Sequence, residues 1–183
     1  MKPAQLLAAL GAAMVLCMLF ACGEGNNPQP TPGPSFSCLI DGVPFTGTTI
    51  TSSVISTQNN ASGDFGKRYD IQATNADGDT TLNLVFGEEP TDNTGSFCLP
   101  LNVPIVQDTN LFAGSTSAFM TIKVGNLIDG FPFDGQVTLT ECDDTDNMIE
   151  GTFSLRSESL ANDSVVFNFT NGVFKDIQVT VIQ

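Results

Sequence analysis

Residues 136–156 read QVTLTECDDTDNMIEGTFSLR, and this stretch decides the fold class. In its first part Val137 and Leu139 alternate with polar residues, and in its last part Ile149 and Phe153 belong to a second alternating run. Between the two parts lie Asp, Thr and Asn residues of the kind that favour tight turns. Period-two alternation on both sides of a turn predicts an antiparallel hairpin with one apolar and one polar face.

The same alternation recurs along the rest of the chain, and no segment keeps a helical period long enough for a core helix. We expect further turns at the Asp-Gly pairs 41–42 and 77–78 and at the Asn-Gly pair 171–172, which separates two alternating runs. The sequence therefore predicts an all-β domain, an antiparallel sandwich or barrel of about nine or ten short strands. The alternating runs that support this prediction are 69–73, 82–86, 120–124, 165–169 and 177–181.

The first residues, 1–21, have the pattern of a removable signal peptide. Lys2 supplies a positive charge, and residues 6–20 form an apolar run that is too short to span a membrane as a helix. Ala21 and Cys22 end a stretch that resembles the lipobox of bacterial lipoproteins, so we expect Cys22 to become the lipidated first residue. The alternative is an ordinary secretory signal peptide with a cysteine near its cleavage site.

Residues 22–34 are rich in proline and glycine, which is typical of an extended linker. Residues 35–183 then form the single folded domain. A lipid anchor followed by a linker predicts a folded domain attached to a bilayer of the bacterial envelope.

The amino-acid composition excludes several classes of function. The whole chain has six basic and twenty acidic residues, a net charge of −14, so we expect no binding to nucleic acid. It has no histidine, which excludes histidine-dependent nucleophilic catalysis and imidazole metal ligands. It also has no tryptophan, and Tyr69 is its one tyrosine, so it lacks the aromatic platforms on which sugars usually stack. The fourteen phenylalanines are expected in the core.

Three cysteines remain in the mature domain, Cys38, Cys98 and Cys142, so at most one disulfide can form within it. Cys38 shares the apolar positions of its strand, whereas alternation places Cys98 and Cys142 on the sides opposite their apolar neighbours. This favours a bond between Cys98 and Cys142 with Cys38 buried. The other two pairings stay open.

Two acidic turns are the candidate metal sites. Asn75, Asp77 and Asp79 have the first spacings of a calcium loop but lack its glycine and its distal glutamate, and Asp144 and Asp146 crowd another turn without that pattern. Asp and Asn are common in hairpin turns for backbone reasons alone. We therefore expect no metal and no cofactor.

The domain resembles a family of uncharacterised all-β lipoproteins of Bacteroidota. The resemblance rests on residues 137–159, which include the Gly-Thr-Phe-Ser stretch 151–154, and on residues 164–181, which include Thr-Asn-Gly-Val-Phe at 170–174. The opening SFSCLIDGVPFTG, residues 35–47, is similar to the start of such proteins. The resemblance implies an all-β lipoprotein of the outer membrane, facing the periplasm or the medium, and adds no catalytic residue. Lipoproteins of Bacteroidota that are exported to the cell surface often carry acidic residues directly after the lipidated cysteine. Glu24 is the one acidic residue there in this chain, which gives little support to surface export.

Three functions fit these observations. The first, which we favour, is a non-catalytic binding module that recognises a protein or small ligand through loops. The second is a structural or stress-related lipoprotein of the outer membrane without a discrete ligand, and the third is a hydrolase that uses carboxylates alone. Residues 100–116 are the least regular part of the domain, and an exposed apolar patch there would favour the first function.

Overall fold

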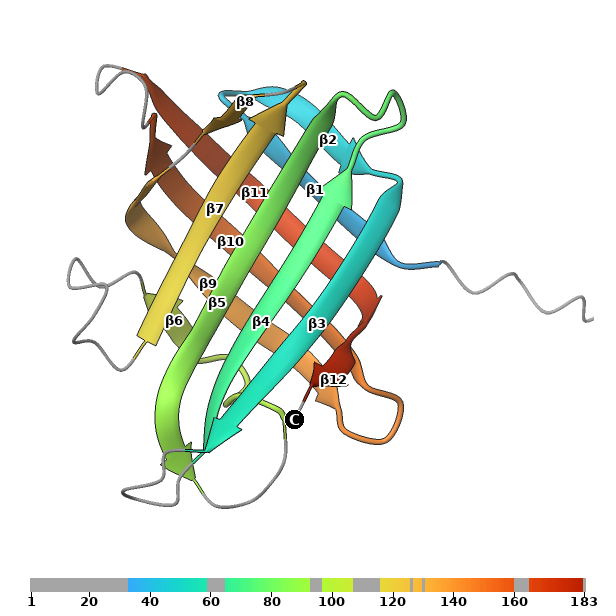
Figure 1. The fold of residues 1–183 in the computed structure, drawn as a ribbon, viewed down its shortest axis with the longest axis vertical. Helices are drawn as coiled ribbons and strands as arrows, with labels where there is room; N and C mark the ends of the chain where they lie inside the picture. Colours follow the sequence, from blue (N-terminus) through green and yellow to red (C-terminus); the bar gives the residue numbers. More distant parts are fainter. Residues whose placement is uncertain are drawn as a thin grey trace, which may run out of the picture. The chain divides into compact units, whose positions relative to one another are not determined.

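Two β-sheets face each other in the computed structural model of the chain, and the strands of one cross those of the other obliquely (Figure 1). The structure describes residues 33–58, 65–92, 97–106, 116–125, 127–129, 131–159 and 165–182, all in one unit that starts at Gly33. Within these residues there are strands and turns and no helix. The fold is a β-sandwich and is not closed into a barrel, which confirms the first of the two predicted architectures.

Each sheet has six strands in the described part of the chain. Sheet A has the order β2-β1-β11-β10-β9-β6, and its strands are β1 (Ser35–Ile40), β2 (Val43–Gly47), β6 (Pro104–Val106), β9 (Phe131–Asp143), β10 (Met148–Glu158) and β11 (Val166–Gln178). Sheet B has the order β12-β3-β4-β5-β7-β8, and its strands are β3 (Thr49–Gln58), β4 (Phe65–Thr74), β5 (Thr80–Asp92), β7 (Thr116–Val124), β8 (Leu127–Asp129) and β12 (Thr180–Ile182).

The core lies between the sheets and is built by the alternating residues of both. In β10, Ile149, Phe153 and Leu155 are buried, while Thr152 and Ser154 are exposed, as the hairpin pattern predicts. Aromatic rings fill much of the space; the rings in contact include Phe36 with Phe153, Tyr69 with Phe86 and Phe86 with Phe174. Burial of this shared apolar face is what fixes the register of the strands.

The number of strands is larger than the nine or ten predicted. The three shortest strands, β6, β8 and β12, have three residues each, which is too short for alternation to be visible in the sequence. One pairing also differs from a purely antiparallel arrangement, because β12 runs parallel to β3 at the edge of sheet B.

The turn predicted at Asn171 and Gly172 is wrong. These residues lie inside β11, which is continuous and pairs with both β1 and β10. Asn171 has a φ of 52°, and the register shifts here in the pairing of β11 with β1 and in its pairing with β10. The Asn-Gly pair therefore forms a β-bulge, which bends the strand. Asn and Gly tolerate a left-handed backbone both in a bulge and in a hairpin turn. An Asn-Gly pair in the sequence therefore does not distinguish the two.

The other predicted turns are confirmed. Residues 41–42 connect β1 to β2, residues 75–79 connect β4 to β5, and residues 144–147 connect β9 to β10. The predicted signal peptide 1–21, the lipidated Cys22 and the linker up to residue 32 lie outside the described residues. None of the described residues belongs to a helix long and apolar enough to cross a membrane.

Candidate functional site

Residues 97–106, which we call the anchored segment, follow β5 and include β6. Within this segment Phe97, Leu99 and Ile105 are buried in the core. Pro104 and Val106 in β6 pair with β9 at the edge of sheet A. Its residues 100–106 belong to the irregular region 100–116 that the sequence suggested as a ligand site, and residues 107–115 of that region lie outside the described residues.

One disulfide and two hydrogen bonds tie the start of the segment to the two sheets. Cys98 forms a disulfide with Cys142 of β9, in sheet A. The ammonium group of Lys67, in β4 of sheet B, donates a 3.0 Å hydrogen bond to the carbonyl oxygen of Cys98. The hydroxyl of Tyr69, two residues further along β4, donates a hydrogen bond to the carbonyl oxygen of Phe97. Lys67 is 2% exposed and Tyr69 is fully buried. The hydrogen bond of Tyr69 is buried, and that of Lys67 is partly buried.

Backbone and turn contacts hold the segment further along. The amide of Phe97 donates to Oδ1 of Asp144 in the β9–β10 turn, at 3.2 Å, and the amide of Asn102 donates to the carbonyl of Leu139 at 2.7 Å. Asn102 has a φ of 60°, a left-handed conformation that asparagine adopts more readily than most residues. The segment is thus fixed to the sandwich on both sides of its exposed portion.

That exposed portion presents apolar side chains to the surface. Leu101 is 44% exposed, Val103 52% and Val106 49%. Pro100 and Pro104 are also exposed. A short run of apolar residues is thus exposed on a segment whose neighbouring residues are anchored. Exposed apolar residues mark interaction sites when they form a contiguous patch.

The anchoring has a consequence for binding. A mobile loop loses conformational entropy when a partner immobilises it, and this loss reduces affinity. A segment already held by a disulfide and by hydrogen bonds loses less conformational entropy.

The disulfide joins the pair of cysteines that alternation favoured, but the premise that both side chains point away from their apolar neighbours is wrong. Cys98 and Cys142 are both partly buried and pack against the core. The pairing skips Thr140, since Glu150 lies opposite Glu141 and Gly151 opposite Leu139. This bulge shifts the alternation by one residue and turns Cys142 inward.

Cys38 is the free cysteine of the described residues and is buried, as expected. Burial raises the pKa of its thiol to about 12, because the thiolate would lose its hydration. A protonated, buried thiol is a poor nucleophile, so Cys38 acts as an apolar core residue.

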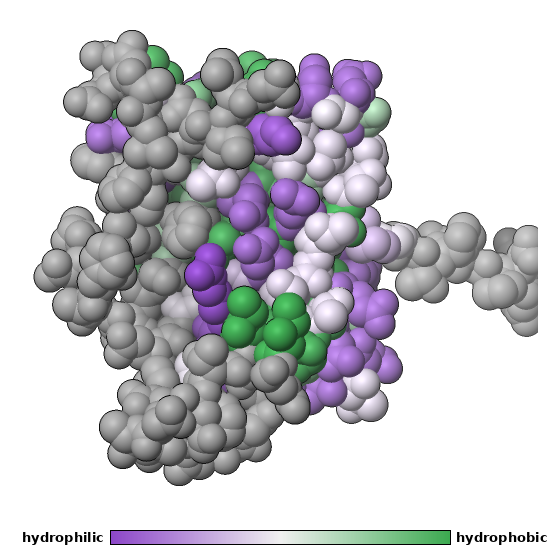
Figure 2. Space-filling view, in the orientation of Figure 1, coloured by the Kyte–Doolittle hydropathy of each residue, from purple (hydrophilic) through white to green (hydrophobic). Residues whose placement is uncertain are grey.

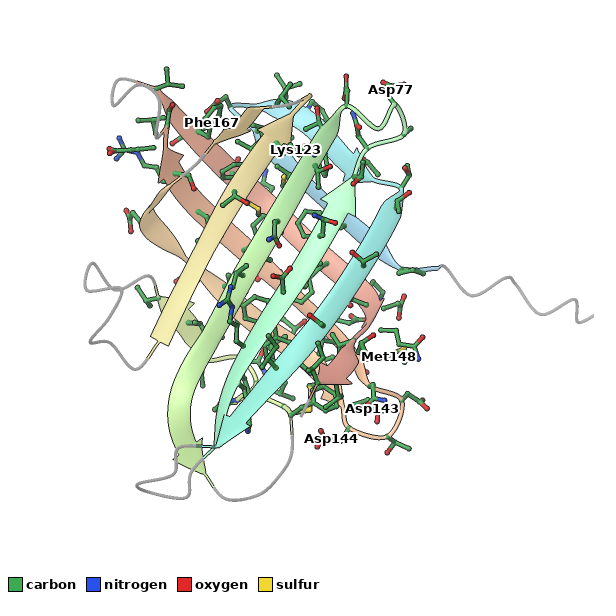
Figure 3. All side chains as sticks on the ribbon, in the orientation of Figure 1. Asp77, Lys123, Asp143, Asp144, Met148 and Phe167 are labelled. Carbon is green, nitrogen blue, oxygen red and sulfur yellow. A yellow bond between two sulfur atoms is a disulfide. The ribbon has the colours of Figure 1, made fainter. Side chains whose placement is uncertain are left out.

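The predicted acidic turns lie at opposite ends of the sandwich, as the labelled Asp77 and Asp144 show (Figure 3). In the first turn, Asn75 and Thr80 donate hydrogen bonds to Oδ1 of Asp79, and these bonds lower the pKa of its carboxyl group. No group of acidic or cysteine residues that could hold a metal occurs among the described residues.

The second turn is organised in the same way. The backbone amides of Thr145 and Asp146 both donate to Oδ1 of Asp143, which lowers the pKa of that carboxyl group. Asp144 holds the anchored segment, as described above. The carboxylates of Asp143 and Asp144 therefore have structural partners within the turn and the adjoining segment.

Two shallow hollows lie on the outer faces of the sandwich. One, of about 370 Å³, lies on sheet B and has Asp70 as its one carboxylate, and the other, of about 400 Å³, lies on sheet A and is lined by no charged residue. Neither hollow offers the pair of carboxylates that a glycoside hydrolase uses.

Sequence reasoning missed Lys67 and Tyr69 as anchors of the segment. A signal for Lys67 was present, since it continues the apolar positions Tyr69, Ile71 and Ala73 with a period of two. A lysine in phase with the buried face of a strand needs a buried hydrogen-bond acceptor, and alternation alone does not tell which one.

Comparison with known proteins adds no relative. No protein-family model matches the chain, and no match was found among curated proteins or among solved structures. The resemblance to Bacteroidota lipoproteins accordingly stays a prediction from the sequence.

Proposed function

We propose that this protein is a lipid-anchored protein of the bacterial envelope that acts as a non-catalytic binding module. The observation that carries the proposal is the exposed apolar run of Leu101, Val103 and Val106 on a segment anchored to both sheets. Such a surface is matched by an apolar surface on another protein. The partner we infer is therefore a protein of the envelope with an exposed apolar patch.

The signal-peptide pattern and Cys22, which follows Ala21 as in a lipobox, support the proposed localisation in the bacterial envelope. The disulfide between Cys98 and Cys142 is also consistent with an oxidising compartment outside the cytoplasm. A net charge of −14 disfavours partners that are strongly anionic.

The localisation is tested by protease treatment of intact and lysed cells, together with a Cys22→Ala variant. We expect Cys22→Ala to release the protein from the membrane fraction. A variant that stays membrane-bound would contradict the lipid anchor. Cleavage on intact cells would assign the domain to the medium, and protection until lysis would assign it to the periplasm.

The interaction is tested by the double variant Leu101→Ser, Val103→Ser. Because both side chains are exposed, we expect the free energy of unfolding to change by less than about 0.5 kcal/mol. The complex of the wild-type protein, seen by native electrophoresis of mild detergent extracts, should be lost in the variant. A complex that is unaffected would contradict the role of the segment.

A further inference from the structure

Two glutamates face each other on the outer surface of sheet A. Glu141 of β9 and Glu150 of β10 are direct partners in the antiparallel ladder. Cys142 and Ile149, the next pair, pack on the core side, so the two glutamates point outward. Like charges that lie opposite each other in a sheet lower its stability. The stability of the fold therefore does not explain this pair.

A cation neutralises one member of the pair. The ammonium group of Lys175, in β11, lies 3.6 Å from Oε1 of Glu150, whose side chain is 21% exposed. Glu141 is exposed and makes no ion pair within the described part of the chain. One carboxylate on this surface is thus left without a cation, beside a second carboxylate.

The unpaired carboxylate lies beside the anchored segment. The segment is bonded to β9 at two places, by the disulfide to Cys142 and by the hydrogen bond from the amide of Asn102 to the carbonyl oxygen of Leu139. Glu141 lies between these two places in the strand. Because neighbouring chains in a sheet are about 5 Å apart, Glu141 borders the segment where Leu101 is exposed.

The turn after β9 adds negative charge next to the start of the segment. Asp144 is exposed and accepts a hydrogen bond from the amide of Phe97. Asp146 is exposed in the same turn. Figure 3 shows Asp143 and Asp144 at one end of the sandwich and Lys123 at the other. The anchored segment is therefore bordered by carboxylates along β9 and at this turn.

The basic residues of the chain do not balance these carboxylates. Apart from the two lysines named above, one basic residue lies outside the described residues, and Lys67 is 2% exposed. Arg68 alternates with buried residues of β4 and so lies on the outer face of sheet B, the face with hydrophilic residues across its middle in Figure 2. Arg156 lies opposite Asp134 in the ladder of β9 and β10. The apolar run is thus bordered by negative charge at Leu101.

We propose that the partner of the anchored segment is a protein whose apolar patch is bordered by lysine or arginine residues, one of which pairs with Glu141. The pairing rests on the proposed function, since the partner is the same. A basic side chain at this place reduces the repulsion between Glu141 and Glu150, so the complex recovers what the free domain loses. Complementary charges at the rim of an interface mainly speed association and select the partner.

Charge reversal at position 141 tests the pairing. The full-length protein would carry a photoreactive residue at position 103, and the yield of its cross-link to the partner would be measured in mild detergent extracts at about 50 and 500 mM sodium chloride. We expect Glu141→Lys to lower the yield about tenfold at the lower salt concentration. Glu141→Gln should lower it less, and the higher salt concentration should weaken the wild-type cross-link.

Asp77→Lys is the matched control, since it makes the same change of charge at an exposed position at the opposite end of the sandwich (Figure 3). This variant should cross-link like the wild type. Equal yields from Glu141→Lys and Asp77→Lys would overturn the pairing and leave the proposed function standing. A wild-type protein that cross-links to no protein, or only to lipid, would contradict the proposed function as well.

The cross-linked peptide identifies the surface of the partner. Its sequence, read by mass spectrometry, should contain lysine or arginine close to the residue attached to position 103. A partner surface without a basic residue near this attachment would count against the proposal, even if its apolar residues match the segment.

The stability of the free domain separates binding from folding. Because both substitutions remove the repulsion with Glu150, we expect Glu141→Gln and Glu141→Lys to unfold at a urea concentration at least as high as that of the wild type. A loss of stability in either variant would show that Glu141 serves the fold, and this result would also overturn the proposal.

Discussion

The ammonium group of Lys67 and the carbonyl oxygen of Cys98 form a 3.0 Å hydrogen bond, and only 2% of the lysine is exposed. Cys98 is also bonded covalently to Cys142. Because Lys67 belongs to sheet B and Cys142 to sheet A, a single residue of the anchored segment is linked to both layers of the sandwich. The apolar side chains that follow are therefore held in a fixed position relative to both sheets.

Tyr69→Phe tests the hydrogen bonds that hold the segment. The substitution removes the hydroxyl that donates to the carbonyl oxygen of Phe97 and leaves this oxygen without that donor. We expect the free energy of unfolding in urea to fall by about 1–3 kcal/mol. Thr152→Val, which removes an exposed hydroxyl, is the control and should change it by less than about 0.5 kcal/mol. Equal effects of the two variants would count against the anchoring role of Tyr69.

The disulfide should make the largest single contribution to the anchoring. Its cysteines are 44 residues apart in the sequence, and loop-closure entropy for a loop of this length corresponds to about 4 kcal/mol. We expect the double variant Cys98→Ser, Cys142→Ser to unfold at a correspondingly lower urea concentration. A reducing agent should reproduce the loss in the wild type and have no effect on the double variant. If reduction leaves the wild-type unfolding curve unchanged, the disulfide does not stabilise the domain.

The buried thiol of Cys38 predicts a dependence of stability on alkaline pH. Its pKa is about 12 in the folded protein and 9.0 in the absence of burial. Above pH 9 the unfolded chain therefore releases a proton that the folded protein keeps, and stability falls as the pH rises toward 12. The measurement is the difference in the free energy of unfolding between the wild type and Cys38→Ala. Parallel pH profiles of the two proteins would contradict this prediction.

Gly151 is a packing constraint in the stretch that decides the fold. A Cβ atom at this position would meet the carbonyl oxygen of Thr138 and the ring of Phe174. We expect Gly151→Ala to destabilise the protein by about 1–3 kcal/mol in urea, because the backbone and the ring must move. Ser154→Ala, at an exposed position of the same strand, is the matched control. A loss of similar size in both variants would show that strand propensity dominates over packing.

The fold was predictable from the sequence because its strands alternate. One face of each long strand is buried, so the period of two is visible in β4, β5, β9 and β10. Alternation failed at Thr140 in β9, since the extra residue of a bulge reverses the phase of the strand. The bulge at Asn171 in β11 was predicted as a turn, because Asn and Gly are common in both. The shortest strands were missed because three residues define no period.

The candidate site was predictable in part. The irregular region 100–116 and the pair Cys98 and Cys142 could be singled out from the sequence alone. The contacts of Lys67 and Tyr69 could not, since they join β4 to residues of the anchored segment about 30 positions away in the sequence. Which side chains of the segment stay exposed also depends on this three-dimensional arrangement.

We propose that the exposed apolar side chains of the anchored segment contact a protein partner. Photo-cross-linking in intact cells tests this contact directly, with a photoreactive residue at Val103 compared with one at Val124 of β7. Both valines are 52% exposed, so the two probes differ in location and not in accessibility. We expect one envelope protein to be cross-linked from position 103 and not from position 124, and this cross-link to be lost in the Cys98→Ser, Cys142→Ser background. The same cross-links from both positions, or none from position 103, would contradict it.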